Sequence, residues 1–142
     1  MKFLSISSLA LAIAATTAFA EPETYKCAFN AEKAGYWVSE EIFLKVDESQ
    51  NTVFVADALT KDKVDGWYPA KLTRVSSKRF NISWKLLSER DVKRQIIHTL
   101  RYTLSFDRRN GKGFALMRPQ GYSNEWRTQG ECLKSAVPKA LR

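Results

Sequence analysis

One histidine, His98, is the side chain in this sequence best suited to act as a general base. A serine hydrolase would pair it with a nucleophile on a Gly-x-Ser-x-Gly turn, and the chain has no such turn. A zinc site would need two or three more nitrogen or sulfur ligands, which are also missing. Because His98 is flanked by Ile96, Ile97 and Leu100, a core histidine is the simpler interpretation. We therefore expect a protein that is not an enzyme and that uses no metal or cofactor.

Two cysteines, Cys27 and Cys132, lie near the two ends of the chain that would remain after export. In an oxidising compartment an isolated pair predicts a disulfide. A bond closing a loop of about 100 residues would stabilise the fold by about 4.7 kcal/mol. The alternative is two free thiols, one of them catalytic. It is less favoured, since a single histidine leaves little to activate a thiolate.

The first twenty residues have the pattern of an export signal. Lys2 precedes an apolar run from Leu9 to Ala15, and Ala18-Phe19-Ala20 is a cleavage motif. The run is too short to span a bilayer, and no later stretch approaches the ~20 apolar residues that a membrane helix needs. The sequence thus predicts a periplasmic or secreted protein cleaved after Ala20. It would have one domain over residues 21–133 and a flexible tail over 134–142.

Alternation of apolar and polar residues dominates the rest of the chain. In Arg79–Leu86 the apolar set is Phe80, Ile82, Trp84 and Leu86, and the same period continues through Arg94–Phe106. A period of two places each set on one face of a strand. Residues 88–100 also fit a helical period from a Ser88 cap, but the Thr, Tyr, Ile and Phe content from Ile96 to Phe106 favours a strand.

Six further segments have strand character, separated by turns. They are 25–30, 37–47, 52–59, 67–75, 113–117 and 124–133. Eight short strands at this spacing predict an all-β antiparallel sandwich or barrel. A disulfide between the first and last strands favours the barrel, because an eight-stranded meander closes by pairing those two.

Gly35-Tyr36-Trp37, placed before the meander, resembles the Gly-x-Trp signature of lipocalins. The resemblance implies a calycin-type, eight-stranded barrel and groups the chain with small exported bacterial β-barrel proteins. In that family the tryptophan packs against an arginine of the last strand, which implies Arg127 here. Tyr25-Lys26-Cys27 is also similar to the start of periplasmic lysozyme-inhibitor barrels. Charge argues against that function, since lysozymes are usually basic and so is this chain.

Charge is unevenly distributed along the chain. Residues 21–65 contain ten acidic and five basic residues, whereas 66–142 contain five acidic and seventeen basic. In an up-and-down meander alternate turns share one end, which would gather a basic rim. The predicted rim consists of Arg74, Lys78, Arg79, Arg108, Arg109 and Lys112. The alternative is a solvated surface that only promotes solubility.

The leading functional prediction is a non-enzymatic binding protein that holds a small apolar or amphipathic ligand inside the barrel. The candidate lumen residues are Trp84, His98, Tyr102 and Trp126. The alternative is a solid barrel, filled by its own side chains, that binds an anionic envelope component or a protein through the basic rim. Nucleic acid is not expected as a partner, because exported proteins rarely meet it.

Overall fold

The computed structural model describes residues 20–90 and 92–142, and the predicted signal segment lies outside this range except for Ala20. The described residues form eight strands and three short 3₁₀ turns. The first four strands are β1 (Glu23–Phe29), β2 (Glu41–Asp47), β3 (Thr52–Asp57) and β4 (Tyr68–Val75). The last four are β5 (Arg79–Arg90), β6 (Ile96–Asp107), β7 (Lys112–Pro119) and β8 (Trp126–Lys134). The 3₁₀ turns are η1 (Glu32–Ala34), η2 (Thr60–Asp62) and η3 (Lys139–Leu141).

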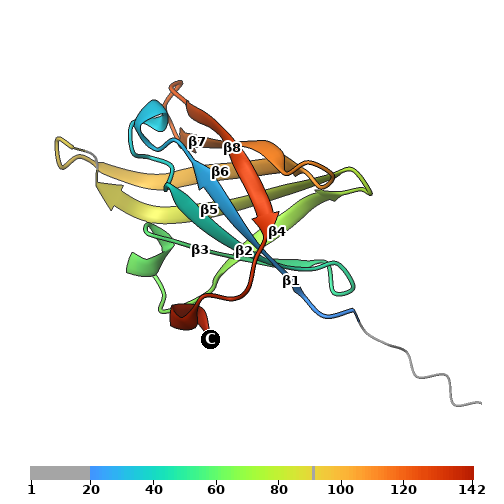
Figure 1. Cartoon of the computed structure of the whole chain (residues 1–142). Helices are drawn as coiled ribbons and strands as arrows, with labels where there is room; N and C mark the ends of the chain where they lie inside the picture. Colours follow the sequence, from blue (N-terminus) through green and yellow to red (C-terminus); the bar gives the residue numbers. More distant parts are fainter. Residues whose placement is uncertain (1–19, 91) are drawn as a thin grey trace, which may run out of the picture.

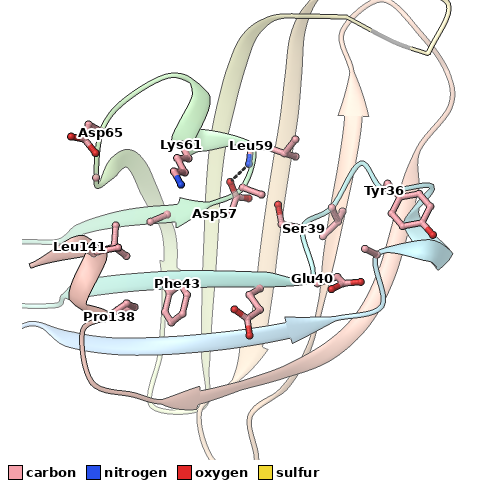
Figure 2. A pocket seen from close by; sticks show the side chains of 17 residues that line it. Tyr36, Ser39, Glu40, Phe43, Asp57, Leu59, Lys61, Asp65, Pro138 and Leu141 are labelled. Carbon is pink, nitrogen blue, oxygen red and sulfur yellow. Dashed lines mark hydrogen bonds between the residues drawn. The ribbon is translucent and has the colours of Figure 1, made fainter.

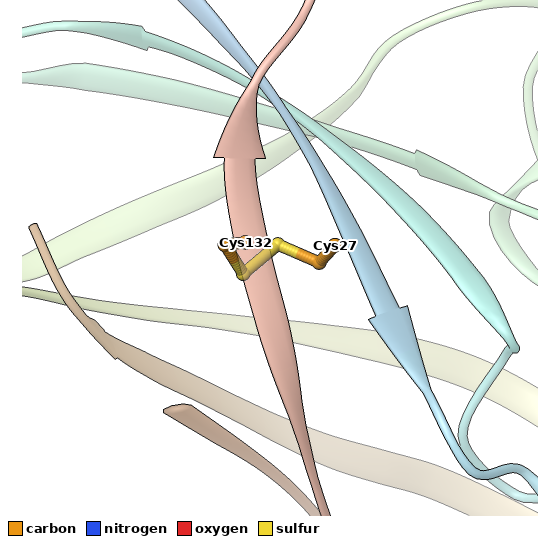
Figure 3. Close-up of a disulfide and its surroundings, with 2 residues drawn as sticks. All are labelled: Cys27 and Cys132. Atoms are coloured by element: carbon orange, nitrogen blue, oxygen red, sulfur yellow. A yellow bond between two sulfur atoms is a disulfide. The ribbon is translucent and has the colours of Figure 1, made fainter. Parts of the chain in front are cut away.

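The strands form a closed barrel in which every strand pairs antiparallel with its neighbours in sequence (Figure 1). The seam is the β1–β8 ladder, which aligns Cys27 with Cys132. The two residues form a disulfide across this seam (Figure 3). The predicted all-β, eight-stranded meander barrel closed by one disulfide is therefore confirmed.

Alternation along β5 and β6 produces the centre of the core. Trp84 faces Tyr102 and Phe80 faces Phe106 across the two strands, and all four side chains are buried. Tyr25 of β1 packs edge-on against Phe80, with 5.9 Å between ring centroids. Each buried apolar side chain of this size contributes roughly 1.5–3 kcal/mol. The interior beside β5 and β6 is thus packed with aromatic and aliphatic side chains.

The segment with two possible periods forms the end of one strand, a turn and the start of the next strand. β5 continues to Arg90, β6 begins at Ile96, and both pair with each other in register. Arg94, in the turn between them, has a left-handed φ of 60°. The strand prediction is therefore confirmed from Ile96 onward, whereas residues 92–95 form the connection between the two strands and Asp91 lies outside the described residues. No helix among the described residues is long and apolar enough to cross a membrane.

Turns at one end of the barrel contact one another, as expected for a meander. The Arg108 amide donates to the Lys78 carbonyl at 2.8 Å, and the Cys132 amide donates to the Gly111 carbonyl at 2.8 Å. Arg108 also forms an ion pair with Glu48. These contacts join the β2–β3, β4–β5 and β6–β7 turns. We call this the rim end, and the other the loop end.

Residues after β8 return along the barrel wall. The Ser135 amide donates to the Thr24 carbonyl at 2.8 Å. Farther on, the Trp67 indole Nε1 donates to the Leu141 carbonyl at 3.2 Å. The last residues, predicted as a flexible tail, thus make hydrogen bonds with the start of β1 and with the residue that precedes β4.

Candidate functional sites

Three of the predicted lumen residues lie in one row across β5 to β8. Trp84 is opposite Tyr102, Tyr102 is opposite Met117, and Met117 is opposite Trp126. The rings of Trp84 and Tyr102 stack with their centroids 5.1 Å apart and their planes within 5°. The fourth candidate, His98, belongs to β6, but the position of its side chain is outside the described part of the structure. The row confirms proximity of the three residues and leaves ligand binding as a prediction.

Polar atoms in this row differ in how they are satisfied. The Tyr102 hydroxyl donates to the Trp37 carbonyl at 3.0 Å. The Trp84 Nε1 is buried and has no hydrogen-bond partner among the described residues. Trp126 is half-buried and packs against Trp37, with ring centroids 5.8 Å apart. Trp84 is therefore a lumen candidate with a buried donor still to offer.

The predicted basic rim is assembled at the rim end, but half of its cations have partners. Arg108 pairs with Glu48, and Arg109 pairs with Asp107 at 2.6 Å. Arg79 donates to the Ser105 hydroxyl at 2.9 Å. The remaining rim residues are Arg74, Lys78 and Lys112, whose exposed side chains have no ion pair among the described residues.

Charge pairing at the rim changes the titration of its acids. The hydrogen bond from Arg109 lowers the pKa of Asp107 well below its usual range. Burial, with a hydrogen bond to Glu23, raises the pKa of Tyr25. Both groups keep their ordinary neutral-pH charge states, so the rim holds ion pairs beside three cations that have no ion pair within the described part of the chain.

A second set of cations lies on the outer wall, where the sequence did not lead us to expect one. Lys85 is directly opposite Arg101, and Arg101 is directly opposite Arg118. All three side chains are exposed. We call Lys85, Arg101 and Arg118 the basic ladder. Neighbouring strands are about 4.8 Å apart, so the ladder places three like charges in a line across β5, β6 and β7.

Counter-charges along the basic ladder are sparse. Arg118 forms an ion pair with Glu125 at 2.6 Å, which lowers the Glu125 pKa. Arg127 of β8 contacts the same carboxylate at 3.0 Å. Arg101 has only the neutral Gln120 side chain, at 3.3 Å, and Lys85 has no partner among the described residues. The Glu125 carboxylate therefore forms ion pairs with Arg118 of the ladder and with Arg127 of β8.

A groove of about 670 Å³ runs along the outside of β2 and β3. The loop containing η2 and the C-terminal segment around Leu141 form its walls (Figure 2). None of the predicted lumen or rim residues whose side chains the structure describes lines it. Sequence reasoning missed the groove, because its walls come from loops far apart in the chain.

No protein-family model, curated protein or solved structure matches this chain. The residues on which the expected lipocalin resemblance was based, Trp37 and Arg127, lie in different surroundings. The ring of Trp37 contacts Trp126, while Arg127 lies outside the barrel, 6.0 Å from the Phe114 ring centroid. At the rim end, the Arg108 guanidinium lies 4.1 Å from the centroid of the Phe80 ring. A function for this chain thus rests on the geometry of its own residues.

Proposed function

We propose that this protein is a non-enzymatic, exported binding protein that contacts a polyanion through the basic ladder, with the rim cations as a second contact. The observation that carries the proposal is the alignment of Lys85, Arg101 and Arg118 on three neighbouring strands. Like charges directly opposite each other destabilise a sheet. Sequences that break a local rule of this kind often do so at functional sites.

An anionic partner would remove this repulsion. Phosphate or carboxylate groups spaced along a polymer or a headgroup layer could contact the three cations together. Arg101 and Arg118 have the planar donor geometry that suits such groups. For an exported protein, the corresponding partner is a phosphate-rich or carboxylate-rich component of the envelope.

Packing of the interior favours contact on the outside of the barrel. Tyr102 and Met117, at the centre of the lumen row, are fully buried by protein atoms. Phe80 and Phe106 are equally buried toward the rim end. An eight-stranded barrel is just wide enough to be filled in this way.

A small ligand inside the barrel is the second candidate function. The observation in its favour is Trp84 Nε1, which is buried without a hydrogen-bond acceptor. A ligand with an acceptor group would satisfy this donor. Native mass spectrometry of the protein purified from its own compartment tests this candidate, because a retained ligand adds mass that denaturation removes.

Retention on heparin and on phosphate-bearing vesicles tests the leading proposal. The ladder variant is Lys85→Thr/Arg101→Thr, and a rim variant is Lys78→Ser/Lys112→Ser. The control is Lys33→Thr/Lys139→Thr, which removes two exposed cations from η1 and η3. Binding of the unmodified protein should fall steeply with salt, because exposed charges are screened within about 8–10 Å at 0.1–0.15 M.

The ladder variant should elute from heparin at clearly lower salt than the control, and the rim variant at an intermediate value. Vesicles with neutral headgroups should not retain the protein. Equal elution of the ladder variant and the control would contradict the proposal, because only net charge would then matter. Retention that is insensitive to salt would favour the ligand inside the barrel instead.

A further inference from the structure

The β5–β6 hairpin extends beyond the wall of the barrel at the loop end. The β4–β5 ladder ends at Ser83, and the β6–β7 ladder ends at Leu100. Ladder pairing of the described residues then runs only between β5 and β6, as far as Arg90 opposite Ile96. Figure 1 shows this hairpin, in yellow, reaching past its neighbouring strands. A two-stranded ribbon is only marginally stable in water, so the projecting part would gain from contact with a second surface.

Apolar side chains of the projecting part are exposed to water. Val92, in the turn, is 96% exposed, and Ile96, at the start of β6, is 47% exposed. Leu87 of β5 is 59% exposed. We call Leu87, Val92 and Ile96 the apolar tip. Exposed apolar side chains that gather in one place mark an interaction site, whereas single ones scattered over a surface do not.

Cations accompany the apolar tip. Arg90 and Arg94 are exposed, and neither forms an ion pair among the described residues. Arg90 Nη1 instead donates to the Arg94 carbonyl at 3.2 Å, across the turn. Residues 85–101 contain five basic and two acidic residues, and the side chains of the acidic pair, Glu89 and Asp91, lie outside the described part of the structure. The hairpin therefore combines exposed apolar surface with a net positive charge.

The apolar tip continues the outer face that carries the basic ladder. Leu86 is buried inside the barrel, whereas Lys85 and Leu87 on either side of it are exposed on the outer face. Residues two apart on one face of a strand are about 7 Å apart, so Leu87 begins where the ladder ends. A surface that meets this side of the hairpin obliquely would contact the ladder and the tip together.

We propose that the partner of the basic ladder is the surface of an anionic phospholipid bilayer, into which the apolar tip inserts. Phosphate-bearing headgroups would lie against Lys85, Arg101 and Arg118, while the tip would reach the acyl boundary. Burial of apolar surface and attraction to anionic lipids both strengthen binding at a bilayer interface. A soluble polyanion would satisfy the cations but would leave the tip in water. The choice of partner rests on the proposed polyanion contact and identifies the polyanion as a layer of lipid headgroups.

Co-sedimentation with vesicles of phosphatidylglycerol and phosphatidylcholine tests the proposal, with heparin retention measured alongside. The tip variant is Leu87→Thr/Val92→Thr, which removes apolar surface and keeps the net charge. The matched control is Val75→Thr/Leu133→Thr, which changes one valine and one leucine that are exposed on β4 and β8, outside the hairpin. Threonine suits strand positions, so both variants should fold.

The tip variant should bind the vesicles about tenfold more weakly than the control, because less apolar surface would leave water on binding. Both variants should elute from heparin at the same salt concentration as the unmodified protein. Equal vesicle affinities of the tip variant and the control would overturn the proposal. So would retention on heparin without binding to the vesicles, which would assign the ladder to a soluble polyanion. Neither result would affect the polyanion contact itself, which fails only if the ladder variant and the lysine control elute alike from heparin.

Val92→Trp provides a gain of binding that misfolding cannot imitate. Tryptophan favours the interface between headgroups and acyl chains, so this variant should bind the vesicles about threefold more tightly than the unmodified protein. The chain already contains four tryptophans, and the difference in emission between the two proteins isolates the added indole. That difference spectrum should shift to shorter wavelength when vesicles are added. Unchanged affinity together with an unshifted difference spectrum would overturn insertion of the tip.

Discussion

Cys27 and Cys132 lie directly opposite each other in the β1–β8 ladder, and their disulfide joins the two strands that close the barrel. The bond links positions 105 residues apart in sequence. Reduction should therefore lower the free energy of unfolding by about 3–5 kcal/mol, because it releases nearly the whole chain in the unfolded state. Urea unfolding of the oxidised and the reduced protein measures the difference. A loss below about 1 kcal/mol would show that the β1–β8 hydrogen bonds alone secure the seam.

Arg108 should contribute more to stability than its neighbour Arg109. Its guanidinium lies over the Phe80 ring, donates to the Ser76 carbonyl at 2.8 Å and pairs with Glu48. Arg108→Ala should cost about 2 kcal/mol, since a stacked contact and a bridge between turns are lost together.

Arg109→Ala is the matched control. Arg109 is largely exposed and pairs with Asp107, two residues away, so its removal should leave the melting temperature nearly unchanged. Thermal unfolding of both variants provides the comparison. Equal losses would mean that the aromatic contact of Arg108 adds nothing.

The basic ladder predicts a conflict between stability and binding. Arg101→Thr removes the middle charge and introduces a residue that favours strands. It should stabilise the barrel by about 0.5 kcal/mol through relief of repulsion from Lys85 and Arg118. The same variant should elute earlier from heparin. Urea unfolding and heparin retention measure the two effects, and a variant that loses both stability and retention would contradict the argument.

Asp57 should make stability depend on pH in a characteristic direction. Burial raises its pKa in the folded state above the ordinary aspartate value of 3.8. Between these two pKa values the folded protein binds more protons than the unfolded chain, so the Asp57 contribution to stability falls as pH rises. Asp57→Asn removes this contribution. Its stability relative to the unmodified protein should therefore increase from about pH 4 toward neutral pH.

Urea unfolding of both proteins across that pH range tests the prediction. Acids with lowered pKa values, such as Glu125 and Glu23, contribute the opposite trend in both proteins and cancel in the difference. Parallel stability curves would show that Asp57 is not desolvated in solution.

Gly130 should tolerate no side chain. It pairs with Gly113 of β7 and with Phe29 of β1, and an added Cβ would lie 2.1 Å from the Ala28 carbonyl oxygen. Gly130→Ala should cost about 3 kcal/mol through overpacking. Gly66→Ala is a useful comparison, because nothing lies within 4 Å and only its φ of 108° opposes a side chain. That variant should cost about 1 kcal/mol, as measured by thermal unfolding.

Most of the barrel could be predicted from local patterns. Alternation in Arg79–Leu86 places Phe80 and Trp84 on the buried face, as observed. The Asn110-Gly111 pair predicts the β6–β7 turn, and Gly111 has the positive φ of 76° that such a turn requires. The predicted strand boundaries agree less well with the structure. The segment 37–47 was expected to be extended throughout, whereas β2 begins only at Glu41 because η1 and its loop occupy the preceding residues.

The candidate sites could be predicted only in part. The grouping of the basic turns at one end could be predicted from the meander topology. The ion pairs of Arg108 with Glu48 and of Arg109 with Asp107 could not, and they leave fewer unpaired cations at the rim than the number of basic residues suggests. Sequence alone could not identify the basic ladder, because the residues opposite Arg101 depend on the register of three strands. The groove was also out of reach, since it needs a β3 carboxylate, a loop hydroxyl and a C-terminal wall in one place.

By itself, the sequence determined the strands, their buried faces and the single possible disulfide, because these follow from a side-chain period of two and from a count of two cysteines. Tertiary structure alone decided which charges stand side by side and which polar atoms are left without partners. Those relationships depend on strand register and on closure of the barrel, which bring together residues from distant parts of the chain.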